Sequence, residues 1–139
     1  MPVEQLSYRL LIVDDDPRMQ ELIETRLKIA GYRTTVARDG YEALRCIHDH
    51  APNGMLLDIN MPRLDGFGVL REMKRLGHLD RTPTMVLTAR KQGADVQEAI
   101  MLGARDFLTK PFEAPVLLAR VARLLHRMPP RLAAVARPA

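Results

Sequence analysis

Short apolar runs alternate with amphipathic segments along most of the chain. The runs are rich in Val, Ile, Leu and Thr, residues typical of strands, and they end at polar residues or glycines. Between them, apolar residues recur every three or four positions, which is the spacing of a helix with one buried face. The predicted strands cover residues 8–13, 32–37, 55–58, 82–88 and 106–109.

The amphipathic segments carry the signals of helix ends. Asp16-Pro17 has the order of an N-cap followed by a first-turn proline, and Gly31 ends that helix. The other helices are expected to begin near residues 40, 67, 91 and 115. Five strands alternating with five helices predict an α/β fold with a doubly wound parallel sheet covered on both faces. The more polar strand 32–37 is expected at an edge of that sheet.

Polar residues that can carry chemistry follow four of the predicted strands. Asp14 and Asp15 follow the first strand, Asp58 the third, Thr88 the fourth and Lys110 the fifth. Because right-handed crossovers place the carboxyl ends of parallel strands along one edge, we expect these side chains in one pocket. The alternative for Asp58 is an ordinary turn residue at the end of a strand.

The residue types in this pocket predict a metal site and a nucleophile. Three neighbouring carboxylates repel one another, and a bound divalent cation removes that cost. Oxygen ligands with open positions suit Mg²⁺, which is the expected cofactor. With the metal and the Lys110 ammonium nearby, Asp58 can attack a phosphoryl group and form an acyl phosphate. The Thr88 hydroxyl can donate to an oxygen of that group.

Composition is typical of one soluble domain. The 139 residues are 47% hydrophobic and 27% charged, and no apolar run approaches the roughly 20 residues that cross a membrane. With the single cysteine Cys46 and no signal-like start, a cytoplasmic protein without a membrane partner is expected. Residues 1–127 are expected to form the domain, and residues 128–139 a disordered tail or linker rich in Pro, Ala and Arg.

The net charge of +4 is concentrated at the C-terminal end. Five arginines and no acidic residue occupy the last twenty positions. Such a segment can attract a nucleotide, a nucleic acid or an acidic protein. A solvated helix face followed by a tail is the simpler interpretation, and we favour it.

Four motifs occur in the order and spacing of a known family. They are Leu-Ile-Val-Asp-Asp-Asp-Pro at 11–17, Leu-Leu-Asp-Ile-Asn-Met-Pro-Arg-Leu-Asp-Gly at 56–66, Val-Leu-Thr-Ala at 86–89 and Phe-Leu-Thr-Lys-Pro-Phe at 107–112. On these motifs, the chain from about Tyr8 to Arg127 resembles the receiver domain of bacterial response regulators, and is similar to CheY and to OmpR/PhoB-type receivers. The resemblance implies a flavodoxin-like or CheY-like fold with strand order 2-1-3-4-5.

The resemblance also implies roles for the matched residues of the pocket. Asp58 would accept a phosphoryl group from a histidine kinase or a histidine phosphotransfer protein. Asp14 and Asp15 would hold Mg²⁺ together with Asp58 and the backbone carbonyl of Asn60. Asn60 and Arg90 would tune the rate of phosphate loss. The protein would then be a phospho-acceptor switch with only slow self-dephosphorylation, and not an enzyme.

The remaining implied roles concern the switch itself. Thr88 would move toward the phosphoryl group, and Phe107 would follow it as the aromatic switch residue. Lys110 would bond a phosphoryl oxygen, and the Lys110–Pro111 peptide would be cis. The output would be a changed surface on the fourth helix, the fifth strand and the fifth helix, recognised by a downstream protein.

That output surface departs from the OmpR/PhoB-type pattern. Val96, Met101 and Val116 stand where those receivers tend to carry Lys, Glu and Glu, and Arg105 stands where they carry an acid. The charged pairs through which those receivers dimerise could not all form, whereas exposed apolar residues would suit an apolar partner. We therefore favour a stand-alone regulator. The alternative is the receiver half of a DNA-binding transcriptional regulator, and only then would nucleic acid be a partner.

A second departure precedes the third strand. The family usually has Asp followed by an aliphatic residue where this chain has Asn53-Gly54. We expect this change to loosen the start of that strand without affecting the pocket.

A rival from another class is a Mg²⁺-dependent phosphatase that works through an aspartyl phosphate. Phosphatases resembling the haloacid dehalogenase group need a second acid two residues after the nucleophile. That position is Asn60, which cannot exchange a proton in this role.

Overall fold

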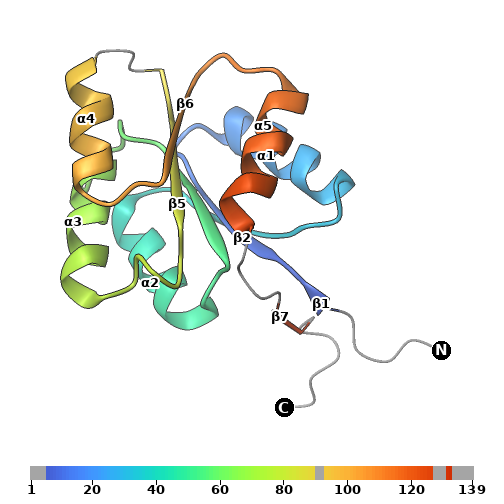
Figure 1. Cartoon of the computed structure of the whole chain (residues 1–139), viewed down its shortest axis with the longest axis horizontal. Coiled ribbons are helices and arrows are strands. Elements are labelled where there is room, and N and C mark those ends of the chain that lie inside the picture. Colours follow the sequence, from blue (N-terminus) through green and yellow to red (C-terminus); the bar gives the residue numbers. More distant parts are fainter. Residues whose placement is uncertain (1–5, 90–92, 127–130, 133–139) are drawn as a thin grey trace.

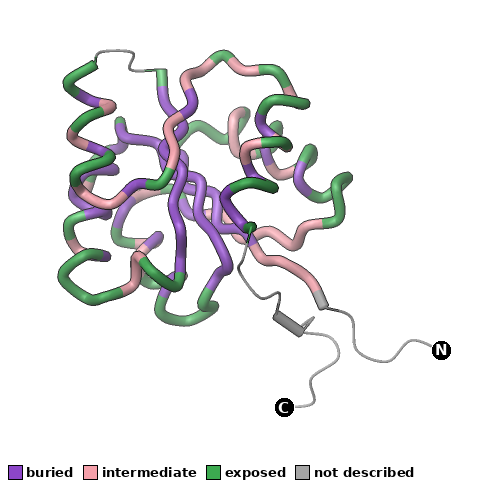
Figure 2. Tube along the Cα trace, in the orientation of Figure 1, coloured by how far each residue is buried: buried purple, intermediate pink, exposed green. Residues whose placement is uncertain are grey.

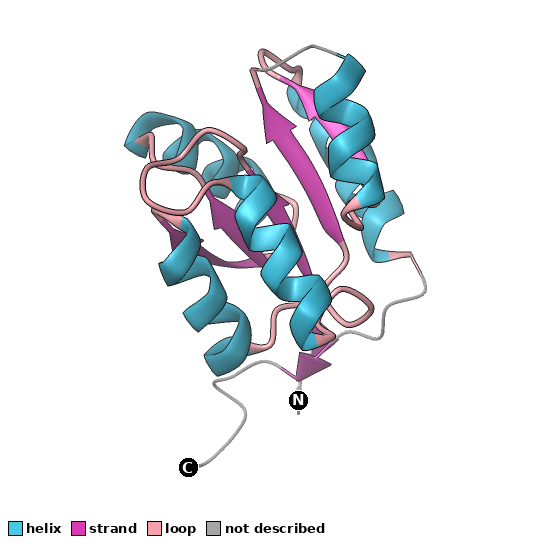
Figure 3. Ribbon diagram, turned by 90° about the vertical axis from the view of Figure 1, so that its left-hand side faces the viewer, coloured by secondary structure: helices cyan, strands magenta, loops and turns pink. Residues whose placement is uncertain are grey.

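The computed structural model describes residues 6–89, 93–126 and 131–132, most of which form a five-stranded parallel sheet between two layers of helices (Figures 1 and 3). Its strands are β2 (Arg9–Val13), β3 (Arg33–Ala37), β4 (Gly54–Leu57), β5 (Thr84–Thr88) and β6 (Asp106–Thr109). Their order across the sheet is β3-β2-β4-β5-β6, which is 2-1-3-4-5 counted along the chain. The predicted fold class and strand order are confirmed, and the polar strand is at an edge as expected.

A helix follows each strand of this sheet. The helices are α1 (Pro17–Ile29), α2 (Gly40–His50), α3 (Gly66–Leu76), α4 (Gly93–Met101) and α5 (Ala114–Leu125). Asp16, Asp39 and Asp65 each cap an N-terminus by accepting a hydrogen bond from a first-turn backbone N–H. The sequence predicted the first two of these helix starts. Among the described residues, no helix is long and apolar enough to cross a bilayer.

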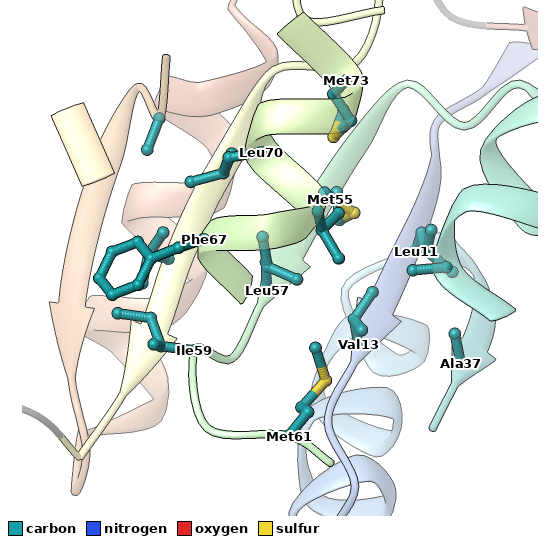
Figure 4. Packing of buried hydrophobic residues seen from close by; sticks show 14 of the residues in the cluster. Leu11, Val13, Ala37, Met55, Leu57, Ile59, Met61, Phe67, Leu70 and Met73 are labelled. Carbon is teal, nitrogen blue, oxygen red and sulfur yellow. The ribbon is translucent and has the colours of Figure 1, made fainter. Parts of the chain in front are cut away.

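The two faces of the sheet are covered by different helices. Ile23 of α1 and Leu117 of α5 pack with Leu56 on one face. On the other face, Figure 4 shows α3 residues, including Leu70, beside Leu57 of β4. Because neighbouring residues of a strand point to opposite faces, β4 contributes to both cores, and Figure 2 shows the central strands buried. This strand leads directly to Asp58.

Some element boundaries differ from the prediction. Tyr8 and Tyr32 precede β2 and β3, and their rings meet edge to face with centroids 6.4 Å apart. Thr82 and Pro83 precede β5 because the Thr82 N–H donates to His78 at 2.9 Å and proline has no N–H. The predicted start of the fourth helix, at residue 91, lies outside the described residues.

The start of β4 is well fixed, and the prediction that Asn53-Gly54 loosens it is wrong. The Asn53 side chain accepts a hydrogen bond from the Arg9 N–H at 2.9 Å, and the Asn53 N–H donates to the Arg9 carbonyl at 2.8 Å. A Cβ on Gly54 would lie 3.0 Å from Leu125 and 3.1 Å from Leu10. The asparagine therefore ties β4 to β2, and the glycine lets α5 pack closely on both strands.

A two-stranded antiparallel pairing lies outside the main sheet. β1 (Leu6–Ser7) pairs with β7 (Arg131–Leu132), so segments from near the two ends of the chain lie side by side (Figure 1). The sequence analysis did not predict this pairing, and it assigned residues 131 and 132 to the tail. Most of that predicted tail, 128–130 and 133–139, lies outside the described residues.

The predicted output surface corresponds to α4, β6 and α5. Met101 is 78% exposed and Val116 is 39% exposed, as expected, and Arg105 is also exposed. Val96, however, is only half-buried rather than exposed. It lies one helical turn before the buried Ala99, so it turns partly toward the sheet.

Candidate functional site

The predicted site residues meet at the carboxyl edge of the sheet. Asp14 follows β2, Asp58 follows β4, Thr88 ends β5 and Lys110 follows β6. The sheet hydrogen bonds continue to these positions: the Asp58 N–H donates to Val13 at 2.9 Å, and the Lys110 N–H donates to Thr88 at 2.9 Å. Asp58 and Lys110 are therefore positioned by hydrogen bonds that continue those of the sheet.

Three carboxylates form the centre of the site. Asp14, Asp15 and Asp58 each offer a carboxylate oxygen, and these oxygens all lie within 4.8 Å of one another. Asp14 is 2% exposed and Asp58 is 7% exposed, whereas Asp15 is exposed. Two of the three acids are therefore buried and one faces solvent, a difference in burial that the sequence analysis did not predict.

Lys110 supplies a positive charge to this cluster. Its ammonium nitrogen lies 2.6 Å from Oδ2 of Asp14 and 3.6 Å from Oδ2 of Asp58. The lysine side chain is itself only 14% exposed. In a partly desolvated site, such a contact strongly offsets the repulsion between the two buried acids. The Lys110–Pro111 peptide is cis, as the resemblance implied.

Burial is the main influence on the ionisation of Asp58. It raises the pKa of this carboxyl above its ordinary value, and the charge of Asp14 raises the pKa further. The Lys110 ammonium, a hydrogen bond from the Thr88 hydroxyl and one from the Asn60 backbone N–H lower the pKa but do not cancel the effect of burial. Asp58 is thus more basic than an exposed aspartate, while three donors surround its charged form.

Two further residues shape the site, and the sequence analysis missed both. The Gln20 side-chain amide of α1 donates to the backbone carbonyl of Asp14. A Cβ on Gly66 would lie 2.5 Å from the Asp58 carbonyl, so only glycine lets α3 begin against the Asp58–Ile59 backbone. The Asp-Gly dipeptide after the proline is a visible turn signal for Gly66, but no local signal marks Gln20.

The acid cluster fits a divalent cation of the Mg²⁺ type. All candidate ligand atoms are carboxylate oxygens, and the exposed Asp15 leaves one side open to water and to phosphate oxygens. Asp16, the next residue in the chain, does not belong to this cluster. Its carboxylate caps α1 by accepting a hydrogen bond from the Arg18 N–H at 3.0 Å. The predicted contribution of the Asn60 carbonyl stays an expectation.

Three further residues were predicted to take part in the switch or to tune it. Phe107 of β6 is half-buried and packs against the α2–α4 side of the core. Asn60 is exposed two residues beyond Asp58. Arg90 lies outside the described residues, so its predicted tuning role is not placed. The arrangement brings together a buried carboxyl with a raised pKa, two further carboxylates that could hold a cation, a hydroxyl donor and an ammonium. These are residue types that can together take up a phosphoryl group.

The chain is similar to known proteins along most of its length. The model of the response regulator receiver domain family matches residues 10–122. Response regulator MprA of Mycobacterium tuberculosis strain H37Rv is 42% identical over 129 residues, which are 93% of this chain and 55% of that protein. The chain therefore spans about half the length of the curated relatives it matches.

Solved structures share the fold as well. The chemotaxis protein CheY4 of Vibrio cholerae has a TM-score of 0.81 and 30% identity, covering 86% of this chain and 99% of that one. A beryllofluoride-activated DrrB receiver domain has a TM-score of 0.78 and 28% identity, covering 88% of this chain and 100% of that one.

Proposed function

Because this chain belongs to the family of response regulator receiver domains, we propose that it is a phosphorylation-controlled signalling switch with Asp58 as phospho-acceptor. The donor is the phosphohistidine of a histidine kinase or a histidine phosphotransfer protein. One observation carries the proposal: buried Asp58 lies within 4.8 Å of two further carboxylates and has the Lys110 ammonium at 3.6 Å. An ordinary turn aspartate at the end of a strand, the alternative interpretation of Asp58, would not require two neighbouring carboxylates and an ammonium.

In the transfer step, a carboxylate oxygen of Asp58 forms a bond to phosphorus. The P–N bond to the donor histidine breaks, and its electron pair leaves with the imidazole nitrogen, which takes up a proton. Burial makes the Asp58 carboxylate more basic and therefore more nucleophilic. Asp14, Asp15 and Asp58 would hold a Mg²⁺ ion, which when bound would supply positive charge to offset the charges on the phosphoryl oxygens. Lys110, 3.6 Å from Oδ2 of Asp58, adds a further positive charge.

The phosphoryl group then changes the local charge. It adds roughly −1.5 to −2 charges and three strong acceptor oxygens beside Asp58. The Thr88 hydroxyl, which donates to the unmodified Asp58, follows the new oxygens, and Lys110 pairs with them. The space vacated by Thr88 lets the half-buried Phe107 turn inward. The conformational signal thus passes from β5 to β6 at the sheet edge.

The output of the switch is a protein-binding surface on α4, β6 and α5. Met101, Ile100 and Val116 leave apolar side chains exposed on these helices. An apolar surface of this kind suits a downstream protein better than the charged pairing of OmpR/PhoB-type receivers. This surface supports a stand-alone regulator, and a covalently linked effector domain is the alternative, because the matched relatives are longer than this chain.

The phosphatase alternative lacks its second acid. Asn60, two residues after Asp58, is exposed and cannot shuttle a proton for fast hydrolysis. We therefore expect the aspartyl phosphate to be lost slowly and without turnover of small phosphate esters.

Acetyl phosphate and beryllofluoride test the proposal without a cognate kinase. With Mg²⁺, intact-mass spectrometry of the native protein should show one phosphoryl adduct from acetyl phosphate. The adduct should be absent from Asp58→Asn and present in Asp80→Asn, a control at an exposed aspartate between α3 and β5. With beryllofluoride, NMR signals of Phe107 and α4 should shift in the wild type and in Asp80→Asn, but not in Asp58→Asn. No adduct in the wild type, or an undiminished adduct in Asp58→Asn, would contradict the proposal.

A further inference from the structure

β6 is an edge strand of only four residues, and its outer side is covered by its own chain. It pairs with β5 on one side and is the last strand of the sheet. The Lys110 N–H donates to Thr88 of β5 at 2.9 Å. The backbone N–H and C=O groups of successive strand residues point to opposite sides of the strand. Phe107 lies three positions before Lys110, so its backbone groups point away from β5, toward the open edge.

Asp106 and Arg120 satisfy these outward groups of Phe107. The Asp106 carboxylate oxygen Oδ1 accepts the Phe107 N–H at 2.8 Å. Nη1 of Arg120, on α5, donates to the same carboxylate oxygen at 3.0 Å and to the Phe107 carbonyl at 3.4 Å. Both outward backbone groups of Phe107, the expected switch residue, are therefore bonded to the same ion pair.

This ion pair is better sheltered than an ordinary surface pair. The Asp106 side chain is 14% exposed and the Arg120 side chain is 33% exposed. Arg123 also contacts Asp106, at 2.9 Å to Oδ2, but it is 68% exposed and has no contact with Phe107 among those of the described residues. The two arginines of α5 thus share one acid, and only Arg120 reaches the backbone of β6.

From these contacts we infer that Asp106 and Arg120 are positioning residues for the phosphorylation switch, a role that rests on the function proposed above. They fix the edge strand β6 between β5 and α5. The same short strand ends at Lys110, whose ammonium must reach Asp14 and Asp58. A fixed β6 backbone therefore places Lys110 for the transfer and gives Phe107 a stationary pivot when its side chain turns.

The Asp106–Arg120 pair also satisfies backbone groups at the edge of the sheet. A free edge strand offers its N–H and C=O groups to other strands, and here the two outward groups of Phe107 are already bonded within the chain. Asp106 and Arg120 consequently hold the inactive and the activated arrangements to the same backbone frame, so that phosphorylation is read out by side-chain rotation.

Amide hydrogen exchange in the unphosphorylated protein tests the positioning role directly. In Arg120→Met, which keeps the aliphatic stem but removes the guanidinium, the Phe107 amide should exchange on the order of tenfold faster. Arg123→Met, the matched control on the same helix, should change that rate by less than about twofold. The Ile12 amide in the interior strand β2 serves as the reference for global unfolding, and its rate should stay the same in both variants.

The transfer rate tests the connection to the site. Arg120→Met should be phosphorylated by acetyl phosphate at least about threefold more slowly than the wild type, a modest loss of placement. Arg120→Lys should lie between them, since an ammonium can pair with Asp106 but lacks the planar fork that also reaches Phe107. Equal Phe107 exchange in Arg120→Met and the wild type, equal effects of both arginine variants, acceleration of Ile12 in parallel, or an unchanged transfer rate would each overturn the inference.

The two proposals can fail separately. Absence of a phosphoryl adduct on the wild-type protein would contradict the proposed function. The exchange comparison uses unphosphorylated protein, so it would still decide whether Asp106 and Arg120 position β6.

Discussion

The ammonium of Lys110 lies 2.6 Å from Oδ2 of Asp14, although the two residues are 96 positions apart in the chain. Asp14 follows the second strand of the sheet order and Lys110 follows the last, so the sheet itself brings them together. Both side chains are largely buried, at 3% and 14% exposure. Their contact makes the ionised acid cluster compatible with a folded core before any cation or phosphoryl group arrives.

Removal of this ammonium should destabilise the protein. Lys110→Met leaves Asp14 and Asp58 buried without their shared positive charge, and we expect the free energy of unfolding to fall by about 2–3 kcal/mol. Urea denaturation without Mg²⁺ measures the change. Lys28→Met is the matched control, because Lys28 forms an exposed pair with Glu24 at 3.5 Å and should change stability by about 0.5 kcal/mol or less. Equal small effects of the two variants would show that the buried contact contributes nothing.

Magnesium should stabilise the folded protein through Asp15. At a Mg²⁺ concentration 100 times the Kd, the wild type should gain about 2.7 kcal/mol, seen as a higher Tm. Asp15→Asn should lose most of this gain. Asp16→Asn should retain it, because the asparagine still caps α1 and Asp16 is not part of the acid cluster. A full magnesium response in Asp15→Asn, or its loss in Asp16→Asn, would place the ion elsewhere.

The raised pKa of Asp58 predicts a pH dependence of stability. In the window between the ordinary carboxyl pKa and the raised value, the folded protein binds more protons at this site than the unfolded chain does. The contribution of Asp58 is therefore most favourable below the window and is lost as the pH rises through it. Comparison with Asp58→Asn in EDTA isolates this contribution, since other groups cancel.

The expected result is that Asp58→Asn becomes more stable than the wild type as the pH rises through that window. Urea denaturation across the acidic range, with both proteins in the same buffers, gives the difference at each pH. The prediction is contradicted if the difference in free energy of unfolding between the two proteins stays constant. It is also contradicted if the wild type gains stability relative to Asp58→Asn as the pH rises.

Gly66 should not tolerate a side chain. The Cβ of Gly66→Ala would lie 2.5 Å from the Asp58 carbonyl and 2.8 Å from Ile59, so the start of α3 would have to move. We expect a loss of about 1–3 kcal/mol in the free energy of unfolding, the usual cost of overpacking. Gly93→Ala, at the start of α4, meets no atom within 4 Å and should be neutral. Equal thermal shifts for the two variants would show that the close approach is not required.

The sequence predicted the sheet and most of the site for one physical reason. Strand order and right-handed crossovers place the carboxyl ends of all parallel strands together, so Asp14, Asp58, Thr88 and Lys110 converge without any knowledge of their side-chain contacts. Helix starts at Asp16 and Asp39 were also local signals, because a cap and the N–H groups it accepts lie within a few residues.

Other features depend on contacts that no local pattern records. Gln20 reaches the Asp14 carbonyl, and Arg120 reaches β6, only because of where α1 and α5 pack. The half-burial of Val96 follows from the rotation of α4 on the sheet, which helical spacing alone does not fix. Asn53-Gly54, interpreted as a weak start to β4, is instead a hydrogen bond to β2 and a close approach of α5.

The most direct measurement locates the acyl phosphate. Protein treated with acetyl phosphate and Mg²⁺ is reduced with borohydride, which converts an aspartyl phosphate to homoserine, and then digested and sequenced by mass spectrometry. The account predicts homoserine at position 58 and at no other aspartate, with Lys110→Met giving a clearly lower yield. Homoserine at Asp14 or Asp15, or none at position 58, would contradict it.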